Sequence, residues 1–436
     1  MTKQKKTQIV VVGGGAGGLP LVRKLGAHYN QDEYDIILID KSRSHIWKPL
    51  LHEVAAGSLD ANLDEIGYGG HGVRWGYRFF YGSLKTIDRE NKRVITAAYI
   101  DESGKEIISE HQIRYDYLVL AYGGVSNDFG ISGVREHCMF LEDRSQAEIF
   151  RQKLLNECLR VSHLVSQGKD AFVDICIIGG GATGVELAAE LYNAAQGLRY
   201  YGLEVFDESR LRVSLLEAGP RILPALPEHL ALAAHKELEL LGVDVRVNTT
   251  VSSVDAKHVH TQDGMSITAE LKLWAAGVKG RTIEDGLDGL SLNRNNQIEV
   301  RNTLQSVDDN HIFAMGDCCA CPQQDGRLVP PRAQSANQMA STVFHNISSM
   351  ISGKPLKSFV YRDKGSLVSL SRFSTIGSLM GNLVGGSMAI DGRLARFAYM
   401  SLYRLHLITV HGWIKGLILI AIGHANQVIR PKLKLH

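Results

Sequence analysis

Two copies of the pattern Gly-x-Gly-x-x-Gly constrain this chain more than any other feature. The first follows the apolar run IVVV and comprises Gly13, Gly15 and Gly18. The second follows the run VDICII and comprises Gly179, Gly181 and Gly184. Glycines at this spacing, between a strand and a helix, let the backbone approach a pyrophosphate at the positive end of the helix dipole. Each copy therefore predicts one dinucleotide-binding βαβ unit.

Each copy is completed by an acidic residue at the end of its next strand. The helical stretch LPLVRKLGAH and the strand YDIILID lead to Asp40, and VELAAELYNAA and RVSLLEAG lead to Glu217. The sequence separation between the last glycine and the acid is longer in the second copy than in the first, which predicts an insertion near GLRYYGLEVFDESR. Such an acid accepts hydrogen bonds from a ribose, and a carboxylate disfavours a 2′-phosphate. Glu217 therefore favours NADH over NADPH, moderated by the nearby Arg221.

The totals are those of a folded protein with more than one domain. A length of 436 residues exceeds what a single core usually organises. The apolar share of 44% and the charged share of 22% are ordinary, and the net charge of +2 gives no reason to expect nucleic acid as a partner. Two dinucleotide sites on one chain indicate two cofactors that exchange electrons.

Two further apolar strands end in glycine, in YDYLVLAYGG and in HIFAMGDCC. With the two glycine motifs, this pattern resembles the flavoprotein disulfide-reductase-like family. The resemblance implies that one non-covalent FAD binds at the first motif, with the later aspartate on its ribitol, through Gly13, Gly15, Ala16, Gly18, Asp40, Gly123 and Asp317. It implies that NADH binds at the second motif and at the strand LKLWAAG, through Gly179, Gly181, Gly184, Glu217 and Gly277.

The same resemblance implies an α/β fold of two Rossmann-like dinucleotide-binding domains, with the NADH domain inserted in the FAD domain. The expected FAD domain covers residues 1–144 and 286–350, and the expected NADH domain covers 145–285. Residues 351–436 are expected to form a C-terminal region with amphipathic, membrane-associating helices.

A missing cysteine pair distinguishes this chain from the disulfide reductases. Disulfide reductases carry a redox Cys-x4-Cys soon after the first motif, whereas SHIWKPLLHEVAAGSLD contains no cysteine. The segments WKPLLHEVAAGSLD, PPRAQSANQMA, GSLVSLS and RPKLKLH instead resemble bacterial type II NADH:quinone oxidoreductases, over essentially the whole chain. The resemblance implies a non-proton-pumping respiratory enzyme. In it, a hydride passes from NADH to FAD, and two electrons then pass to a membrane quinone, ubiquinone or menaquinone.

The segment PPRAQSANQMAS places two amides one helical turn apart in a bed of alanines. On spacing alone, a helix whose amides are satisfied by backbone is the simpler interpretation. The family resemblance favours the other one, a quinone site formed by Ala333, Gln334, Ala336 and Gln338. It also implies that Glu186, on the helix after the second motif, assists proton delivery to the quinone.

Cys318 and Cys321 have the spacing of half a zinc site. Structural zinc usually needs two such pairs, and the other cysteines are scattered. The sequence therefore predicts no metal site and interprets these cysteines as small buried residues. Their position after Asp317 leaves a sulfide:quinone oxidoreductase open as an alternative.

From Arg393 to the C-terminus there are seven basic residues and no acidic residue. On a helix from Arg393 to about Lys415, interrupted at Gly412, the basic residues and His411 share one stripe, which is typical of binding to an anionic membrane surface. The alternative is a core or dimer helix with a solvated basic face, so a homodimer stays open. No apolar run reaches the roughly 20 residues of a spanning helix, nor does a signal peptide stand out.

The expected location is therefore peripheral, on the cytoplasmic face of the inner (cell) membrane. Two further alternatives remain at this stage. One is a soluble NADH:ferredoxin-type reductase, which would have no use for the basic, apolar tail. The other is a membrane redox-sensing flavoprotein without rapid turnover.

Overall fold

The computed structural model describes residues 5–60, 65–198, 208–363, 365–370, 374–380, 387–390, 407–419 and 422. The chain divides into two compact units, each formed by segments that lie apart in the sequence. Unit 1 consists of Met1–Trp47, Glu65–Val125 and Val278–Arg362. Unit 2 consists of Lys48–Asp64, Ser126–Gly277 and Asp363–His436.

These boundaries differ from the expected ones at 145 and 285. The central segment of unit 2 begins at Ser126, whose N–H donates to Glu142 at 2.8 Å, and the N–H of Val254 donates to the carbonyl of Ser132 at 3.0 Å. Unit 2 also takes in 48–64, assigned from sequence to the FAD domain, and the chain from Asp363 onward.

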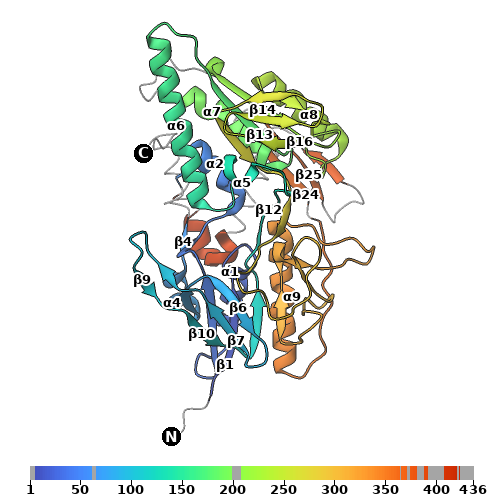
Figure 1. Cartoon of the computed structure of the whole chain (residues 1–436). Coiled ribbons are helices and arrows are strands. Elements are labelled where there is room, and N and C mark those ends of the chain that lie inside the picture. The colour runs from blue at the N-terminus through green and yellow to red at the C-terminus, as the bar shows by residue number, and fades with distance from the viewer. Residues whose placement is uncertain are drawn as a thin grey trace. The chain divides into compact units, whose positions relative to one another are not determined.

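A parallel sheet with five strands in the described part forms the centre of unit 1 (Figure 1), in the order β22-β11-β1-β2-β5. Its strands are β1 (Thr7–Val12), β2 (Tyr34–Asp40), β5 (Arg78–Tyr81), β11 (Tyr117–Leu120) and β22 (Ile312–Ala314). Most residues of β1 and β2 are apolar and buried. Near-continuous apolar strands are typical of parallel sheets covered on both faces.

Helices α1 (Gly18–His28) and α9 (Ala333–Ile351) of unit 1 pack against each other, although they lie far apart in the sequence. Helix α4 (Tyr68–Trp75) packs against α1 as well. The remaining elements are β3 (Ser44–His45), β4 (Ile66–Gly67), β6 (Leu84–Asp88), β7 (Arg93–Thr96), β8 (Tyr99–Ile100), β9 (Glu106–Ile108), β10 (His111–Arg114), β20 (Val278–Gly280), β21 (Ile298–Glu299), η4 (Gly316–Cys318) and β23 (Cys319–Ala320). Strand β12 (Gly124–Ser126) crosses the boundary to unit 2.

Unit 2 has its own parallel sheet, in the order β15-β14-β13-β19. The strands are β13 (Val173–Ile178), β14 (Leu211–Leu216), β15 (Asp244–Arg246) and β19 (Leu271–Trp274). The helices are α2 (Leu51–Ala56), α5 (Val134–His137), α6 (Arg144–Ser166), α7 (Ala182–Leu198) and α8 (Glu228–Leu241), with short turns η1 (Lys48–Leu50) and η3 (Glu208–Arg210). Two parallel sheets with strand–loop–helix connections confirm the predicted α/β class.

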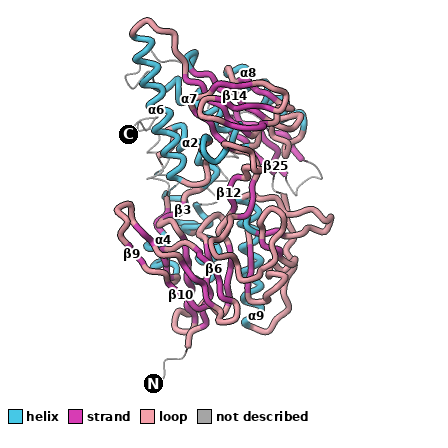
Figure 2. The backbone as a smooth tube through the Cα atoms, in the orientation of Figure 1, coloured by secondary structure: helices cyan, strands magenta, loops and turns pink. Residues whose placement is uncertain are grey.

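Two antiparallel sheets complete unit 2. Strands β16 (Val251–Val254), β17 (His258–Thr261) and β18 (Ser266–Thr268) contribute buried side chains to a core that includes Trp274. Strands β24 (Gly365–Leu370), β25 (Ser374–Met380) and β26 (Ser387–Ile390) form the other sheet. Strand β24 packs against α7 and α8, and Figure 2 shows this region as strand. The sequence had predicted only helices for the C-terminal region.

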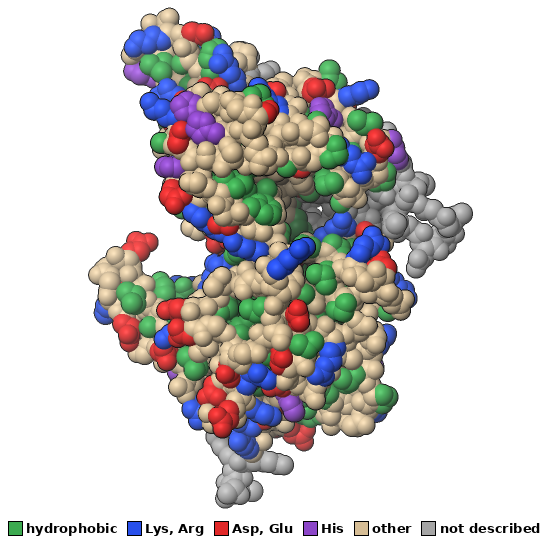
Figure 3. Space-filling view, turned by 45° about the vertical axis from the view of Figure 1, so that its right-hand side comes forward, with side chains coloured by type: hydrophobic (Ala, Val, Ile, Leu, Met, Phe, Trp, Pro, Cys, Tyr) green, Lys and Arg blue, Asp and Glu red, His purple; other side chains and the backbone are tan. Residues whose placement is uncertain are grey.

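The described end of the chain is helical at residues 407–411 and 413–419. Gly412 lies between these stretches with φ +81°, which confirms the predicted interruption. The expected basic residues other than Lys415 lie outside the described residues, as do residues 199–207 of the predicted insertion around 197–210. Among the helices that the structure describes, none is both long and apolar enough to cross a membrane. Acidic and basic side chains are intermixed on the face shown in Figure 3.

Candidate functional site

The first glycine loop of unit 1 forms an open cradle at the start of α1. Gly13 has φ +102°, and a Cβ there would lie 2.4 Å from the carbonyl oxygen of Ala121. A Cβ on Gly18 would lie 1.8 Å from the carbonyl oxygen of Gly13. A Cβ on Gly15 would meet no atom within 4 Å. The outer glycines therefore permit a turn that no larger residue could adopt, and the middle one faces open space.

The second loop repeats this geometry in unit 2. Gly179 has φ +117°, and a Cβ there would lie 2.8 Å from the backbone of Ala275. A Cβ on Gly184 would lie 2.1 Å from the carbonyl oxygen of Gly179, whereas one on Gly181 would meet nothing within 4 Å. These are the three roles of a dinucleotide fingerprint, namely a tight turn, close backbone approach to a pyrophosphate and close packing of helix on strand.

The two predicted acids lie on their glycine loops in matching ways. The N–H of Gly14 donates to Asp40 Oδ2 at 2.6 Å, and the N–H of Ser42 donates to Oδ1 at 2.7 Å.

In unit 2, the N–H of Gly180 donates to Glu217 Oε2 at 2.8 Å, and the N–H of Gly219 donates to Oε1 at 2.7 Å. Each carboxylate is therefore held at the loop by two backbone donors. Because a carboxylate oxygen can accept more than one hydrogen bond, each acid keeps capacity for ribose hydroxyls.

Asp317 follows β22, which pairs with β11 in the sheet of unit 1. The preceding Gly316 has φ +76°, and a Cβ there would lie 3.3 Å from Ala336 Cβ. A Cβ on Gly17 would lie 3.0 Å from the carbonyl oxygen of Ala336. The first turn of α9 therefore touches both the glycine loop and the Gly-Asp turn, and a small side chain at Ala336 permits that approach.

The loop after β11 supplies two more features of this cradle. Gly123 has φ +76° and open space where a Cβ would stand. The hydroxyl of Tyr122 is buried and has no hydrogen-bond partner among the described residues, and burial raises the pKa of this phenol. A buried donor without a partner is a group that a bound ligand can satisfy. The residues present therefore fit a bound dinucleotide.

The two predicted glutamines lie one turn apart on α9. Both are partly buried. The amide of Gln338 donates to the carbonyl of Arg362 at 2.9 Å and accepts from its N–H at 3.1 Å. Asn346, further along the same helix, makes the same reciprocal pair with Lys357, at 2.9 and 2.8 Å. The side-chain amide of Gln338 is thus satisfied by backbone, as the interpretation from spacing alone predicts for it. Together, Gln338 and Asn346 hold the last segment of unit 1 along α9.

Glu186 lies on α7 in unit 2, and it is buried beside a histidine that sequence reasoning missed. His52 Nδ1 is 3.6 Å from Glu186 Oε2, with side chains 3% and 8% exposed. Burial lowers the pKa of His52 to about 4, and a backbone hydrogen bond to Pro49 opposes this shift. The imidazole is therefore neutral at pH 7. A signal was present, because His52 stands within WKPLLHEVAAGSLD.

Helix α7 carries two further buried polar groups on the same face, at i+4 and i+7 from Glu186. Asn193 Nδ2 donates to Glu190 Oε1 at 2.6 Å, and Asn193 Oδ1 has no partner among the described residues. Helix α2 packs against this helix and against α6. A buried polar row of this kind costs stability unless its members hydrogen-bond, so it is a candidate functional feature.

Other predicted residues have simpler surroundings. Gly277 has φ +67°, and a Cβ there would lie 2.6 Å from the ring of Phe129. Cys318 and Cys321 are free and buried, and burial raises the pKa of each thiol to about 12. Thiols with a raised pKa are poor nucleophiles and poor metal ligands. This favours their interpretation as small buried residues.

Known proteins that are similar to this chain identify its family. Residues 7–340 match the pyridine nucleotide-disulphide oxidoreductase family. A type II NADH:quinone oxidoreductase of Haemophilus influenzae is 45% identical over 441 residues, covering 98% of this chain and 99% of the relative. One from Staphylococcus aureus is 30% identical over 396 residues, covering 88% and 93%.

Solved structures agree on the fold. NDH2 from Plasmodium falciparum, in complex with NADH, matches with a TM-score of 0.81 at 18% identity, over 99% of this chain and 100% of that chain. The sulfide:quinone oxidoreductase of Aquifex aeolicus matches with a TM-score of 0.69 at 18% identity, over 98% and 96%. The fold alone does not separate these two kinds of enzyme, but the sequence identity of 45% and 30% over most of the chain does. It confirms that the chain belongs to the type II NADH:quinone oxidoreductases, within the pyridine nucleotide-disulphide oxidoreductase family.

Proposed function

We propose that this chain oxidises NADH and reduces a quinone, with FAD held at the cradle of unit 1 and NADH at the cradle of unit 2. The observation that carries the proposal is the packing of Ala336 against both Gly17 and Gly316. It places the first turn of α9, which bears the predicted quinone signature, beside the loop and the Gly-Asp turn that would hold the flavin. When bound, the flavin supplies the two-electron chemistry that links the two substrates.

In this proposal, the chain's own groups mainly bind and orient. Open backbone at Gly15 and Ala16, at the start of α1, receives the pyrophosphate of FAD, while Asp40 accepts from its ribose. Asp317 accepts from the ribitol, and the loop at Gly123 lies along the same cofactor.

The loop of Gly179, Gly181 and Gly184 receives the pyrophosphate of NADH in the same way. Glu217 accepts from the adenosine ribose, and Gly277 lies on the nicotinamide side. Because the nearby carboxylate would repel a 2′-phosphate, we expect a preference for NADH over NADPH.

For the quinone, we propose a site over the first turns of α9. The small side chains of Ala333 and Ala336 leave room for a flat ring, and the Gln334 amide can donate to a quinone carbonyl. The amide of Gln338 hydrogen-bonds to the backbone of Arg362, so we expect Gln338 to hold that segment in position beside the site.

A quinone that accepts two electrons must also take up two protons. We propose that Glu186 delivers a proton, with neutral His52 at 3.6 Å as its buried neighbour. A neutral imidazole can accept a proton at one nitrogen and donate from the other, so it suits a relay.

We further propose that the chain binds a membrane surface through its C-terminal helical residues. Trp413 is 73% exposed and Ile414 is 78% exposed, and Leu417, Ile418 and Ile422 are also exposed. Large apolar side chains gathered on one exposed segment mark a contact with a partner or a lipid surface. A lipid-soluble quinone favours the membrane, on the cytoplasmic side where NADH is present.

The test is turnover of the purified, FAD-loaded chain with NADH and either ubiquinone-1 or menadione, with and without lipid. Anaerobic stopped-flow measurement separates flavin reduction by NADH from flavin reoxidation by quinone. We expect both half-reactions to be fast enough to account for turnover. Reduction by NADH without quinone-dependent reoxidation would contradict the proposal and favour a redox-sensing flavoprotein.

A further inference from the structure

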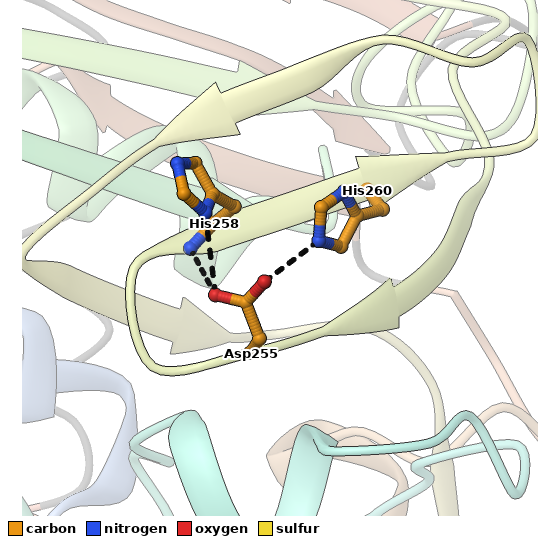
Figure 4. Close-up of side chains that lie close together, drawn as sticks. All are labelled: Asp255, His258 and His260. Carbon is orange, nitrogen blue, oxygen red and sulfur yellow. Dashed lines mark hydrogen bonds and ion pairs between the residues drawn. The ribbon is translucent and has the colours of Figure 1, made fainter.

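One hairpin of unit 2 gathers three side chains that can ligate a metal ion (Figure 4). Asp255 lies in the turn between β16 and β17, and His258 and His260 lie on β17. Because side chains alternate along a strand, the two histidines face the same side. One ligand atom from each residue can be chosen so that all three lie within 4.8 Å of one another. None of these residues belongs to the proposed cofactor or quinone sites.

The turn holds the carboxylate in place before any ion arrives. The N–H of Asp255 donates to the carbonyl of His258 at 3.0 Å. Asp255 Oδ1 accepts from the N–H of Lys257 at 2.7 Å and from the N–H of His258 at 2.8 Å. The other oxygen, Oδ2, is directed at His260 Nε2, 2.8 Å away, and His258 Nδ1 lies 3.4 Å from Oδ1. Two backbone N–H groups therefore orient the carboxylate toward the two imidazoles, and a third backbone hydrogen bond closes the turn.

Two of the three separations are close to those of a first-row transition-metal site. With bonds of about 2.0–2.2 Å, two ligands of a tetrahedral Zn²⁺ ion lie about 3.3 Å apart. The carboxylate–imidazole separations of 2.8 and 3.4 Å lie on either side of this value. An ion bound here would replace the hydrogen bond between Asp255 Oδ2 and His260 Nε2.

The alternative is an ordinary surface ion pair. Both histidine side chains are 38% exposed, and exposed pairs contribute little to stability. Hydrogen bonds from His260 and from the N–H groups of Lys257 and His258 hold the pKa of Asp255 far below its usual range. The carboxylate is thus ionised in all ordinary buffers, and solvent can supply the remaining ligands of an ion.

We propose that Asp255, His258 and His260 bind a divalent first-row transition-metal ion such as Zn²⁺, with water completing the coordination. Two imidazoles and a carboxylate are a ligand set that suits such ions and leaves positions open. The hairpin packs on the core of unit 2 through Val254 and Val259. An ion that binds only the folded hairpin therefore stabilises unit 2 by mass action.

The direct test is calorimetric titration of Zn²⁺ into the tag-free, full-length, FAD-loaded protein after chelator treatment. We expect His258→Ala and His260→Ala each to weaken binding at this site at least about tenfold, because even outer-shell changes cost that much. Unit 2 has other histidines outside this hairpin, so a matched control is needed. His235→Ala serves, since it removes a histidine that is 23% exposed and pairs with Glu239 at 3.4 Å in the same unit.

Two other measurements keep the test decisive. Zn²⁺ should raise the melting temperature of the wild type and of His235→Ala, but not that of Asp255→Asn, because an ion that binds only the folded hairpin stabilises the folded state. Co²⁺ should give weak visible bands without an intense thiolate band. Equal Zn²⁺ affinity in all the variants, or a thiolate band that accounts for the bound Co²⁺, would overturn the proposal.

Discussion

His52 Nδ1 lies 3.6 Å from Glu186 Oε2, and both side chains are buried in unit 2. The pair joins α2 to α7, two helices that are far apart in the sequence and pack together in the fold. Since burial lowers the pKa of His52 to about 4, the contact at pH 7 is between a neutral imidazole and a carboxyl group, and is not an ion pair. A neutral buried base beside the proposed proton donor has consequences that can be measured.

We expect His52→Gln to make the protein less sensitive to acid. The unfolded chain protonates His52 near 6.5, whereas the folded chain does so only near 4. The unfolded state binds more protons within this window, so stability is full above pH 6.5 and falls as the pH drops toward 4. The group accounts for a loss of about 3 kcal/mol over that range.

Urea unfolding of wild type and variant at pH 7, 6, 5 and 4.5 measures the difference. His235→Gln, which changes a partly exposed histidine of the same unit, should follow the wild type. Parallel pH curves for wild type and His52→Gln would show that His52 titrates normally in the folded protein.

We expect Asp317→Ala to lose most of its FAD, because alanine cannot accept the hydrogen bonds that the carboxylate would accept from the ribitol. Asp317→Asn should keep part of it, since its amide oxygen can still accept. Flavin absorbance per chain after gel filtration provides the measurement. The control is Asp325→Ala, which removes an acid of the same unit that pairs with Arg327 at 2.6 Å. Full retention of FAD by Asp317→Ala would remove this residue from the proposed site.

We expect Glu217→Arg to shift the preference from NADH toward NADPH, because the charge near the 2′ position is reversed. The ratio of kcat/KM for the two nucleotides provides the measurement. The variant also loses the acceptor for the N–H groups of Gly180 and Gly219, so Glu217→Gln, which keeps one acceptor oxygen, is the control. An unchanged ratio in Glu217→Arg would place the ribose elsewhere.

We expect Gln334→Ala to slow flavin reoxidation by quinone and to leave flavin reduction by NADH nearly unchanged. Losing one hydrogen bond to a neutral carbonyl costs about 0.5–1.5 kcal/mol, or roughly 2- to 13-fold in kcat/KM. Anaerobic stopped-flow measures the two half-reactions separately. Equal slowing of both would mean that α9 supports the flavin and does not contact quinone.

For Gln338→Ala, we expect slower reoxidation of the same order, again with reduction by NADH nearly unchanged. Asn346→Ala tests the cause, because Asn346 holds Lys357 as Gln338 holds Arg362. If only Gln338→Ala slows reoxidation, its effect is local to the quinone site. If both variants do so equally, the position of the 357–362 segment is what matters.

We expect Trp413→Ser/Ile414→Ser to weaken binding to anionic vesicles at least about tenfold, because burying each large apolar side chain contributes about 1.5–3 kcal/mol. Flotation of the FAD-loaded full-length protein measures the bound fraction. Leu240→Ser, at an 81% exposed position on α8, is the matched control. A double variant that floats like the wild type would move the membrane contact to another surface.

Some features of this protein could be read from short stretches of sequence because short-range physics determines them. Gly13 and Gly179 permit a backbone turn that other residues cannot adopt, and the strands and helices around them follow from apolar periodicity. The positions of Asp40 and Glu217 follow in turn, since Asp40 ends the strand next to its glycine loop and Glu217 directly follows the corresponding strand. The proposed ligands Asp255, His258 and His260 are equally local, since all three lie in one hairpin.

Other features required the tertiary structure, because they depend on which distant segments pack together. The sequence around Gln338 does not predict that its amide hydrogen-bonds to the backbone of Arg362. The sequence around Glu186 likewise does not predict its contact with His52. The C-terminal strands likewise form a sheet against α7 and α8, where the sequence had predicted only helices. A side chain's partner is decided by the packing of whole elements, and burial then determines its charge, as the lowered pKa of His52 shows.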